Sequence, residues 1–292
     1  MKRTVQKLAY VHVYSEDPAQ TADFFRELFG WEVAEGQKGQ LNVAMDRYAH
    51  RISIYKREQS GIKAVGWQAL NRKDFMETAN ILANAGVPYV MGTEEECQER
   101  GVTAFLSFTD PAGVTAEVCY APHVTRPGIQ SVGRLDVLDL VHVTIMLPPD
   151  KYEPALEFYQ DVLGFEISDI STIGPGAVAF TRCSENHHNL AFGAMPVPEP
   201  SLNHIMFEVG KIEDVMKTYY KAIDKRIKIK GPGRHGNCRT QHVYLQIPGL
   251  GETDLEIGYG HLKIPEDGKW EVVNYKFDDF EGFTAGIINA WL

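Results

Sequence analysis

The sequence lacks the usual features of secreted, membrane-spanning and nucleic-acid-binding proteins. Its four cysteines show no CxxC spacing, so neither a disulfide framework nor a zinc knuckle is expected. It has no run of eighteen apolar residues and no apolar leader after Met1. With 29 Lys and Arg against 39 Asp and Glu, the net charge of −10 disfavours binding to nucleic acid. We therefore expect a cytoplasmic protein that binds neither nucleic acid nor membrane.

The length of the chain points to two domains. At 292 residues and 44% hydrophobic residues, it is long enough for two cores of ordinary size. Prolines and glycines cluster between residues 121 and 135, where a joint is expected. We predict a first domain over residues 1–125 and a second over 135–292.

An internal repeat supports this division. Residues 8–14 alternate in polarity as a strand does, and Asp17 and Pro18 begin a helix that Gly30 ends. Residues 141–143 repeat the Val-His-Val of residues 11–13, and residues 158–167 resemble residues 24–33. Each half therefore reads as two modules, each with one strand, a helix and three further strands.

Three predicted strands of the second half carry candidate metal ligands. His142 lies on the strand over residues 140–146, His204 on that over 203–208, and Glu256 on that over 253–259. If the fold brings these strands side by side, two histidines and a carboxylate form a set that suits non-heme Fe(II) and leaves positions open for substrate and oxygen. A single such histidine is more often a hydrogen-bonded core residue.

When the two halves are aligned by their repeat, the first half carries an incomplete copy of this set. His12 falls opposite His142 and Glu117 opposite Glu256, but Trp67 falls opposite His204. An indole would then replace the middle ligand, and His12 would be a structural residue. We therefore expect the metal site in the second half alone.

The order of these residues is similar to that of a known family. The residues that carry the resemblance are His142, His188-x-Leu190-Ala191-Phe192, His204, Gly233-Arg234-His235-Gly236-Asn237, Tyr244 and Glu256-Ile257-Gly258-Tyr259-Gly260. The chain resembles, over its whole length, the type I extradiol ring-cleaving catechol dioxygenases of the vicinal-oxygen-chelate superfamily. The resemblance implies an α+β fold of two tandem domains, each a pair of βαβββ modules forming an open barrel-like cup. It also implies a homo-oligomer that uses O2 to cleave a catechol ring beside its two hydroxyls, in aromatic catabolism.

The resemblance also assigns roles to individual residues. His142, His204 and Glu256 would bind Fe(II), with Mn(II) as the alternative, and His188 would be the acid and base that exchanges protons with the substrate. Such a role needs a group that gains and loses a proton near working pH, as histidine does.

The family pattern places three more residues around the substrate. His235 and Tyr244 would hydrogen-bond the substrate oxygens and an oxygen intermediate, and Asn237 would support them. Tyr244 can also be read as an ordinary strand aromatic. Two departures from the pattern are Cys238, where relatives tend to carry an acidic residue, and a longer turn over residues 247–252, which leaves the register between Tyr244 and Glu256 open.

The remaining polar candidates are less specific. Thr144 shares the face of His142, and Lys230 falls where relatives that cleave a carboxylated catechol carry an arginine, so a polar or carboxylated substrate is expected, with a solvated Lys230 as the alternative. His187 is expected to be exposed because adjacent strand residues face opposite ways. His242 fits a pocket mouth or the surface equally well, and His261 is read as structural.

Two other functions remain open at this point. A metal-dependent isomerase or lyase that stabilises an enediolate belongs to the same superfamily, but such enzymes usually need four protein ligands or a second acidic base. A non-catalytic protein that sequesters an aromatic compound would have no use for His188, His235 and Tyr244 beside a full ligand set.

Overall fold

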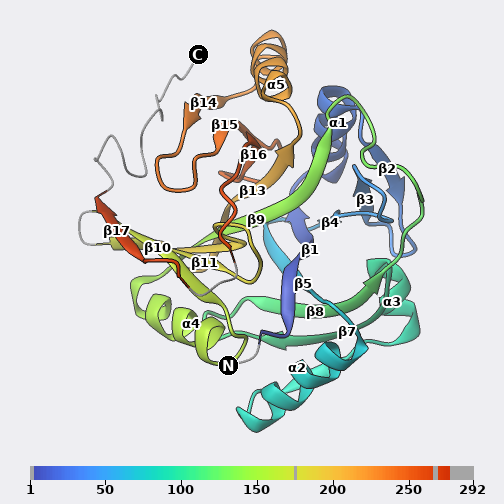
Figure 1. Ribbon diagram of the computed structural model, residues 1–292. Helices are drawn as coiled ribbons and strands as arrows, with labels where there is room; N and C mark the ends of the chain where they lie inside the picture. The colour runs from blue at the N-terminus through green and yellow to red at the C-terminus, as the bar shows by residue number, and fades with distance from the viewer. Residues whose placement is uncertain (1–2, 174–175, 266–268, 277–292) are drawn as a thin grey trace.

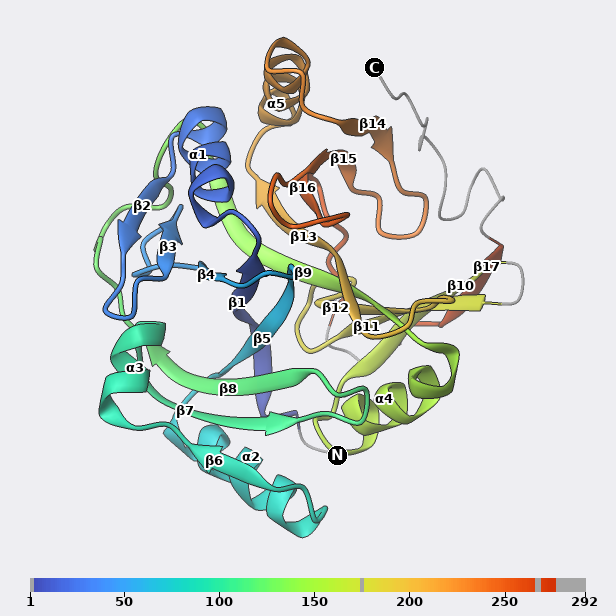
Figure 2. The same cartoon turned by 180° about the vertical axis from the view of Figure 1, so that it is seen from behind.

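The structure, a computed structural model, describes residues 3–173, 176–265 and 269–276 (Figure 1). It contains two twisted β-sheets with helices on their outer sides, and Figure 2 shows the same arrangement from behind. Residues 277–292, the end of the second predicted domain, lie outside the described residues. Among the helices described, none is long and apolar enough to span a membrane.

The first sheet has the strand order β2-β3-β4-β1-β5-β8-β7-β6. Its strands are β1 (Val5–Ser15), β2 (Glu32–Glu35), β3 (Leu41–Ala44), β4 (Ile52–Lys56), β5 (Gly61–Ala69), β6 (Tyr89–Met91), β7 (Val102–Thr109) and β8 (Thr115–Pro122). The helices between them are α1 (Pro18–Phe29), α2 (Arg72–Asn84) and α3 (Glu94–Arg100).

The second sheet has the order β14-β15-β16-β13-β9-β12-β11-β10-β17. Its strands are β9 (Val137–Leu147), β10 (Glu166–Ile173), β11 (Gly176–Arg182), β12 (Leu190–Ala194), β13 (Ser201–Val209), β14 (Ile229–Arg234), β15 (Gln241–Gln246), β16 (Asp254–Tyr259) and β17 (Val273–Lys276). The helices of this half are α4 (Pro149–Asp161) and α5 (Ile212–Asp224).

The expected fold class is confirmed. Each half contains two successive βαβββ modules, to which α3 and β17 are added, and both sheets remain open.

Helix α1 begins and ends where the sequence predicts. The Asp17 side chain accepts a hydrogen bond from the Gln20 amide, and Gly30 ends the helix with a φ of 70°. The domain limits of 1–125 and 135–292 stay a prediction.

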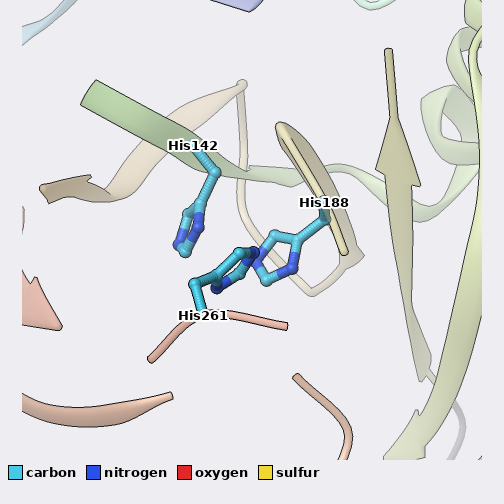
Figure 3. Close-up of side chains that lie close together, drawn as sticks. All are labelled: His142, His188 and His261. Carbon is cyan, nitrogen blue, oxygen red and sulfur yellow. The ribbon is translucent and has the colours of Figure 1, made fainter. Parts of the chain in front are cut away.

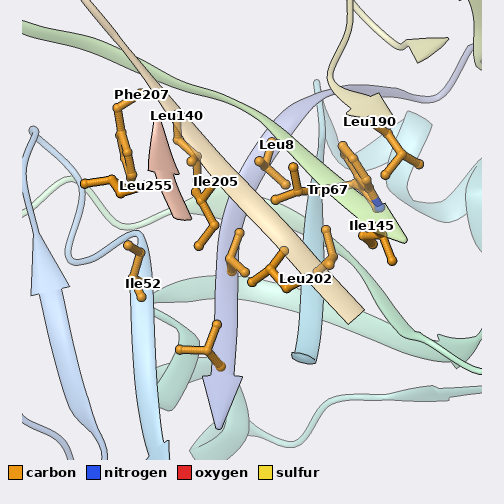
Figure 4. Packing of buried hydrophobic residues seen from close by; sticks show 14 of the residues in the cluster. Leu8, Ile52, Trp67, Leu140, Ile145, Leu190, Leu202, Ile205, Phe207 and Leu255 are labelled. Atoms are coloured by element: carbon orange, nitrogen blue, oxygen red, sulfur yellow. The ribbon is translucent and has the colours of Figure 1, made fainter. Parts of the chain in front are cut away.

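One hydrophobic core holds the two halves together. Strands β1 and β9 lie beside each other at the centre of the molecule (Figures 1 and 2). The buried side chains of both halves meet there (Figure 4). Aromatic rings cross the boundary, with Trp31 5.0 Å from Phe207 and Trp67 5.1 Å from Phe165 between ring centroids. The second sheet is therefore supported from behind by the first.

The strand registers correct the alignment of the two halves. They match Tyr10 with His142, His12 with Thr144, Ala64 with His204, and Glu117 with Glu256. The prediction that Trp67 replaces a ligand was wrong, because Trp67 matches Phe207 and lies in the core between the halves. Both β1–β5 and β9–β13 contain register shifts, which alternation of polarity does not reveal.

Candidate metal centre

The three predicted ligands meet on neighbouring strands of the second sheet. Strands β9, β13 and β16 are adjacent. His142 Nε2 lies 3.0 Å from His204 Nε2 and 3.2 Å from Glu256 Oε2, and the third side of this triangle is 3.4 Å. Ligands about 2.1 Å from a metal and on neighbouring vertices of an octahedron are separated by about 3 Å, so the triangle has the right size for one face of such a site.

The protonation of these residues also suits a cation. His204 Nδ1 donates a hydrogen bond to Asn203 Oδ1, 2.7 Å away, which leaves the Nε2 lone pair for a metal. Burial lowers the pKa of His204 to about 3, although Glu256 partly opposes this, so the ring is neutral. Burial would raise the pKa of Glu256, but the neighbouring imidazoles, His142 first, hold it well below its usual range.

Two of the three ligands, His142 and Glu256, have buried polar atoms without a hydrogen-bond partner among the residues that the structure describes. Neither carboxylate oxygen of Glu256 has a hydrogen-bond partner within the described residues, although the side chain is 1% exposed. A buried carboxylate without partners is costly, and a bound cation removes that cost. The donor set, the spacing and these unpartnered oxygens all fit a divalent metal.

Two further groups of possible ligands share members with this triangle. They are His142 with His188 and His261, and His235 with His242 and Glu256. In the second group His242 Nδ1 lies 3.3 Å from the carbonyl oxygen of Thr240 and His235 Nε2 lies 2.9 Å from the Tyr244 hydroxyl. Of the three groups, His142, His204 and Glu256 alone combine two imidazoles and a carboxylate on three adjacent strands.

A cavity of about 390 Å³ opens above the triangle, within the size range of small-molecule sites. One wall carries Met146, Val178, Phe180 and Met195, so it is apolar. The predicted residues that line this cavity, besides the three ligands, are Thr144, His188, Lys230, His235 and Tyr244. The cavity can therefore hold a small aromatic molecule against the three ligands.

His235 and Tyr244 form the polar side of the cavity. Tyr244 is directly opposite Glu256 in the β15–β16 ladder, which settles the register that the turn over residues 247–252 left open. Burial and then the Glu256 charge raise the pKa of Tyr244, so it stays a neutral hydroxyl. His242 is buried and its ring stacks on that of His235 at 4.0 Å between centroids, so of its two predicted positions the surface one was wrong.

His188 reaches the cavity from the loop before β12. Its ring lies 4.0 Å from that of His142 between centroids, and both turn toward His261 (Figure 3). The prediction that His187 is exposed was wrong. It is fully buried and bound to Asp169, because it precedes the strand and the alternation rule does not apply there. His261 was read as structural because its position in the sequence fits no motif. Its ring lies 5.0 Å from that of His188 and 5.7 Å from that of His142 between centroids.

Three predicted substrate contacts have different surroundings. The Thr144 hydroxyl lies 3.0 Å from His204 Nε2. The Lys230 side chain is 33% exposed, and its Nζ donates to Asp254 Oδ2 at 2.6 Å. Asn237 is buried, but it is absent from the cavity lining and its Oδ1 accepts a hydrogen bond from the Cys238 amide. It can act on a substrate only through its neighbours.

In the first half, a guanidinium lies beside Glu117, the residue that corresponds to Glu256. Arg100 Nε lies 2.7 Å from one oxygen of Glu117, and its terminal nitrogen lies 2.6 Å from the other. The Tyr10 hydroxyl also donates to Glu117, at 2.7 Å. Glu117 is buried and forms a charged pair with Arg100. This half therefore balances its carboxylate with a protein cation and has no histidine at the two other ligand positions.

The fold and this site define the class of the protein. Residues 7–118 and 140–248 both match the Glyoxalase/Bleomycin resistance protein/Dioxygenase superfamily. The chain belongs to this superfamily, whose match covers both halves.

Within this superfamily, the chain is similar over most of its length to extradiol dioxygenases. The chain is 30% identical over 285 residues to an iron-dependent extradiol dioxygenase of Rhodococcus jostii, covering 91% of this chain and 93% of the relative. It is 29% identical to a biphenyl-2,3-diol 1,2-dioxygenase of Metapseudomonas furukawaii, covering 93% and 91%. A crystal structure of BphC, a halotolerant catechol dioxygenase, superposes with a TM-score of 0.86 at 28% identity, covering 94% and 92%. These matches confirm the resemblance drawn from the sequence and the expected class of enzyme, an extradiol dioxygenase.

Proposed function

We propose that the chain cleaves a catechol-type diol at an Fe(II) ion held by His142, His204 and Glu256, with Mn(II) as the alternative metal. The observation that carries this proposal is the convergence of three donor atoms, 3.0 to 3.4 Å apart, beneath an aromatic-sized cavity. A bound redox metal would supply electrons to O2 and a Lewis acid to the two substrate oxygens.

The residues around the cavity then have separate tasks. His188 accepts a proton from a substrate hydroxyl, since burial, and then the nearby histidines, lower its pKa and keep the ring neutral. His235 and Tyr244, linked at 2.9 Å, hydrogen-bond the substrate oxygens and fix the ring plane. Asn237 stands behind them through its bond to the Cys238 amide.

The apolar wall favours a bicyclic substrate. A second aromatic ring can pack on Met146, Val178, Phe180 and Met195, where burial of apolar surface contributes about 25 cal/mol per Å². Relatives named for biphenyl-2,3-diol and 1,2-dihydroxynaphthalene support this choice. Lys230 supports the second candidate, a carboxylated catechol, although Asp254 already offsets its charge. We also propose that the protein works in the cytoplasm, since its four cysteines are buried free thiols. The family resemblance, in turn, supports a homo-oligomer.

Anaerobic reconstitution with Fe(II), followed by air and a panel of catechols, tests the reaction. We expect a yellow ring-fission product and one O2 consumed per substrate. Stoichiometric iron with no product from any catechol would favour the enediolate-type enzyme, and failure to bind metal would favour the sequestering protein. Reconstitution with Mn(II) in parallel compares the two metals.

Replacement of Lys230 by Met distinguishes the two substrate classes. If the apolar wall sets specificity, KM for catechol, biphenyl-2,3-diol and 3,4-dihydroxyphenylacetate should change by similar factors, and the wild type should prefer the bicyclic diol by at least about tenfold. If Lys230 binds a carboxylate, KM should rise selectively for 3,4-dihydroxyphenylacetate. Steady-state kinetics on the three substrates gives the answer.

A further inference from the structure

Three buried side chains form a hydrogen-bonded chain behind the cavity. His188 Nδ1 lies 3.1 Å from His187 Nδ1, and His187 Nε2 lies 2.7 Å from Asp169 Oδ2. Asp169 and His187 are fully buried and His188 is 3% exposed. Nothing in the reaction assigned above uses Asp169 or His187, yet they are attached to the nitrogen of His188 that faces away from His261 (Figure 3).

The order of donors along this chain follows from the chemistry of its last member. The Asp169 carboxylate only accepts hydrogen bonds, so His187 Nε2 must carry the hydrogen. Burial lowers the pKa of His187, with Asp169 opposing, so this ring is neutral and its Nδ1 is an acceptor. The hydrogen between the two rings therefore belongs to His188 Nδ1, and His188 Nε2 is left with a lone pair.

We propose that Asp169 and His187 are positioning residues that hold His188 in the tautomer whose Nε2 can take a proton from the substrate. This inference rests on the proposed function of His188. In the step concerned, a substrate O–H bond breaks, an Nε2–H bond forms on His188, and the resulting positive ring keeps its Nδ1–H bond to His187. The Asp169 carboxylate then stabilises that charge through His187, as the buried aspartate of a serine protease does for its histidine.

A backbone contact makes the proposal sharply testable. The Val273 amide of β17 donates to Asp169 Oδ1 at 2.9 Å, so this oxygen must remain an acceptor. In an Asp169→Asn variant the amide oxygen takes that place and the NH2 group faces His187 Nε2 as a donor. His187 would then carry its hydrogen on Nδ1 and donate to His188 Nδ1. His188 would be forced into the opposite tautomer, with Nε2 unable to accept a proton.

The tautomer can be read directly, without turnover. In magic-angle-spinning NMR of the metal-free full chain with 15N-labelled histidine, we expect His188 to carry its hydrogen on Nδ1 in the wild type and on Nε2 in Asp169→Asn. The signal is assigned by its loss in His188→Gln. Ser171→Ala is the matched control, because Ser171 is equally buried, two residues further along β10, and its hydroxyl has no partner among the described residues. It should leave His188 unchanged.

Kinetics of the Fe(II)-loaded enzyme gives the second readout. We expect Asp169→Asn to lower kcat by at least about 100-fold with KM and iron content changed less than about threefold, since the site remains built but its base is misoriented. His187→Phe should lower kcat similarly by removing the link. An unchanged His188 tautomer in Asp169→Asn, or an unchanged kcat in both variants, would overturn the proposal. A wild type that turns over no catechol while the tautomer switches as expected would instead count against the proposed function.

Discussion

A Glu256→Gln variant should retain its fold and lose the bound metal. Its rate of ring cleavage should fall by on the order of 1000-fold. The substitution keeps the shape of the side chain but removes a negative charge that histidine ligands cannot supply. Loss of groups that merely orient metal ligands already costs about 10- to 100-fold in affinity, so loss of an anionic ligand should cost more. Metal content by mass spectrometry and O2 consumption measure the two effects separately.

The first half of the chain offers a matched control for this experiment. Glu117 occupies the position that corresponds to Glu256 on the adjoining sheet, and Glu117→Gln is the same chemical change. When the Glu117→Gln variant is assayed at low temperature, its metal content and kcat should equal those of the wild type. If Glu256→Gln still bound one equivalent of metal with unchanged affinity, the assignment of the ligands would be wrong.

The convergence of the three proposed ligands could be predicted because its signal is local. His142, His204 and Glu256 each lie on a strand whose alternation is plain, and each strand reached the expected place in the sheet. The same alternation could not give the register between halves. A slip of two residues leaves every side chain on its original face, so the choice of His12 rather than Tyr10 as the counterpart of His142 looked acceptable.

The residues that the sequence did not reveal lie in loops or act through distant partners. His261 follows β16 and approaches His188 because the chain turns back there. The role proposed for His187, which precedes β12, depends on its hydrogen bond to Asp169, 18 residues earlier on β10. No periodic pattern connects such positions, because their contact is created by the packing of strands and loops. The same holds for Arg100, whose partner is 17 residues away.

In contrast to Glu256→Gln, Glu117→Gln should lower the free energy of unfolding by about 3 kcal/mol. Arg100 and Glu117 are 8% and 1% exposed, so removing one charge leaves the other buried without its counter-ion. Denaturant unfolding followed by fluorescence measures this loss.

The double variant Arg100→Met, Glu117→Leu tests the cause of that loss. Replacing a buried ion pair by apolar side chains of similar volume is often neutral or stabilising, so most of the lost stability should return. A loss in the double variant as large as in Glu117→Gln would mean that the pair is needed for packing and not for charge balance. Recovery would mean that the buried Glu117 carboxylate needs a cation for charge balance. In the first half that cation is the Arg100 guanidinium, and in the second half we propose that a metal takes its place.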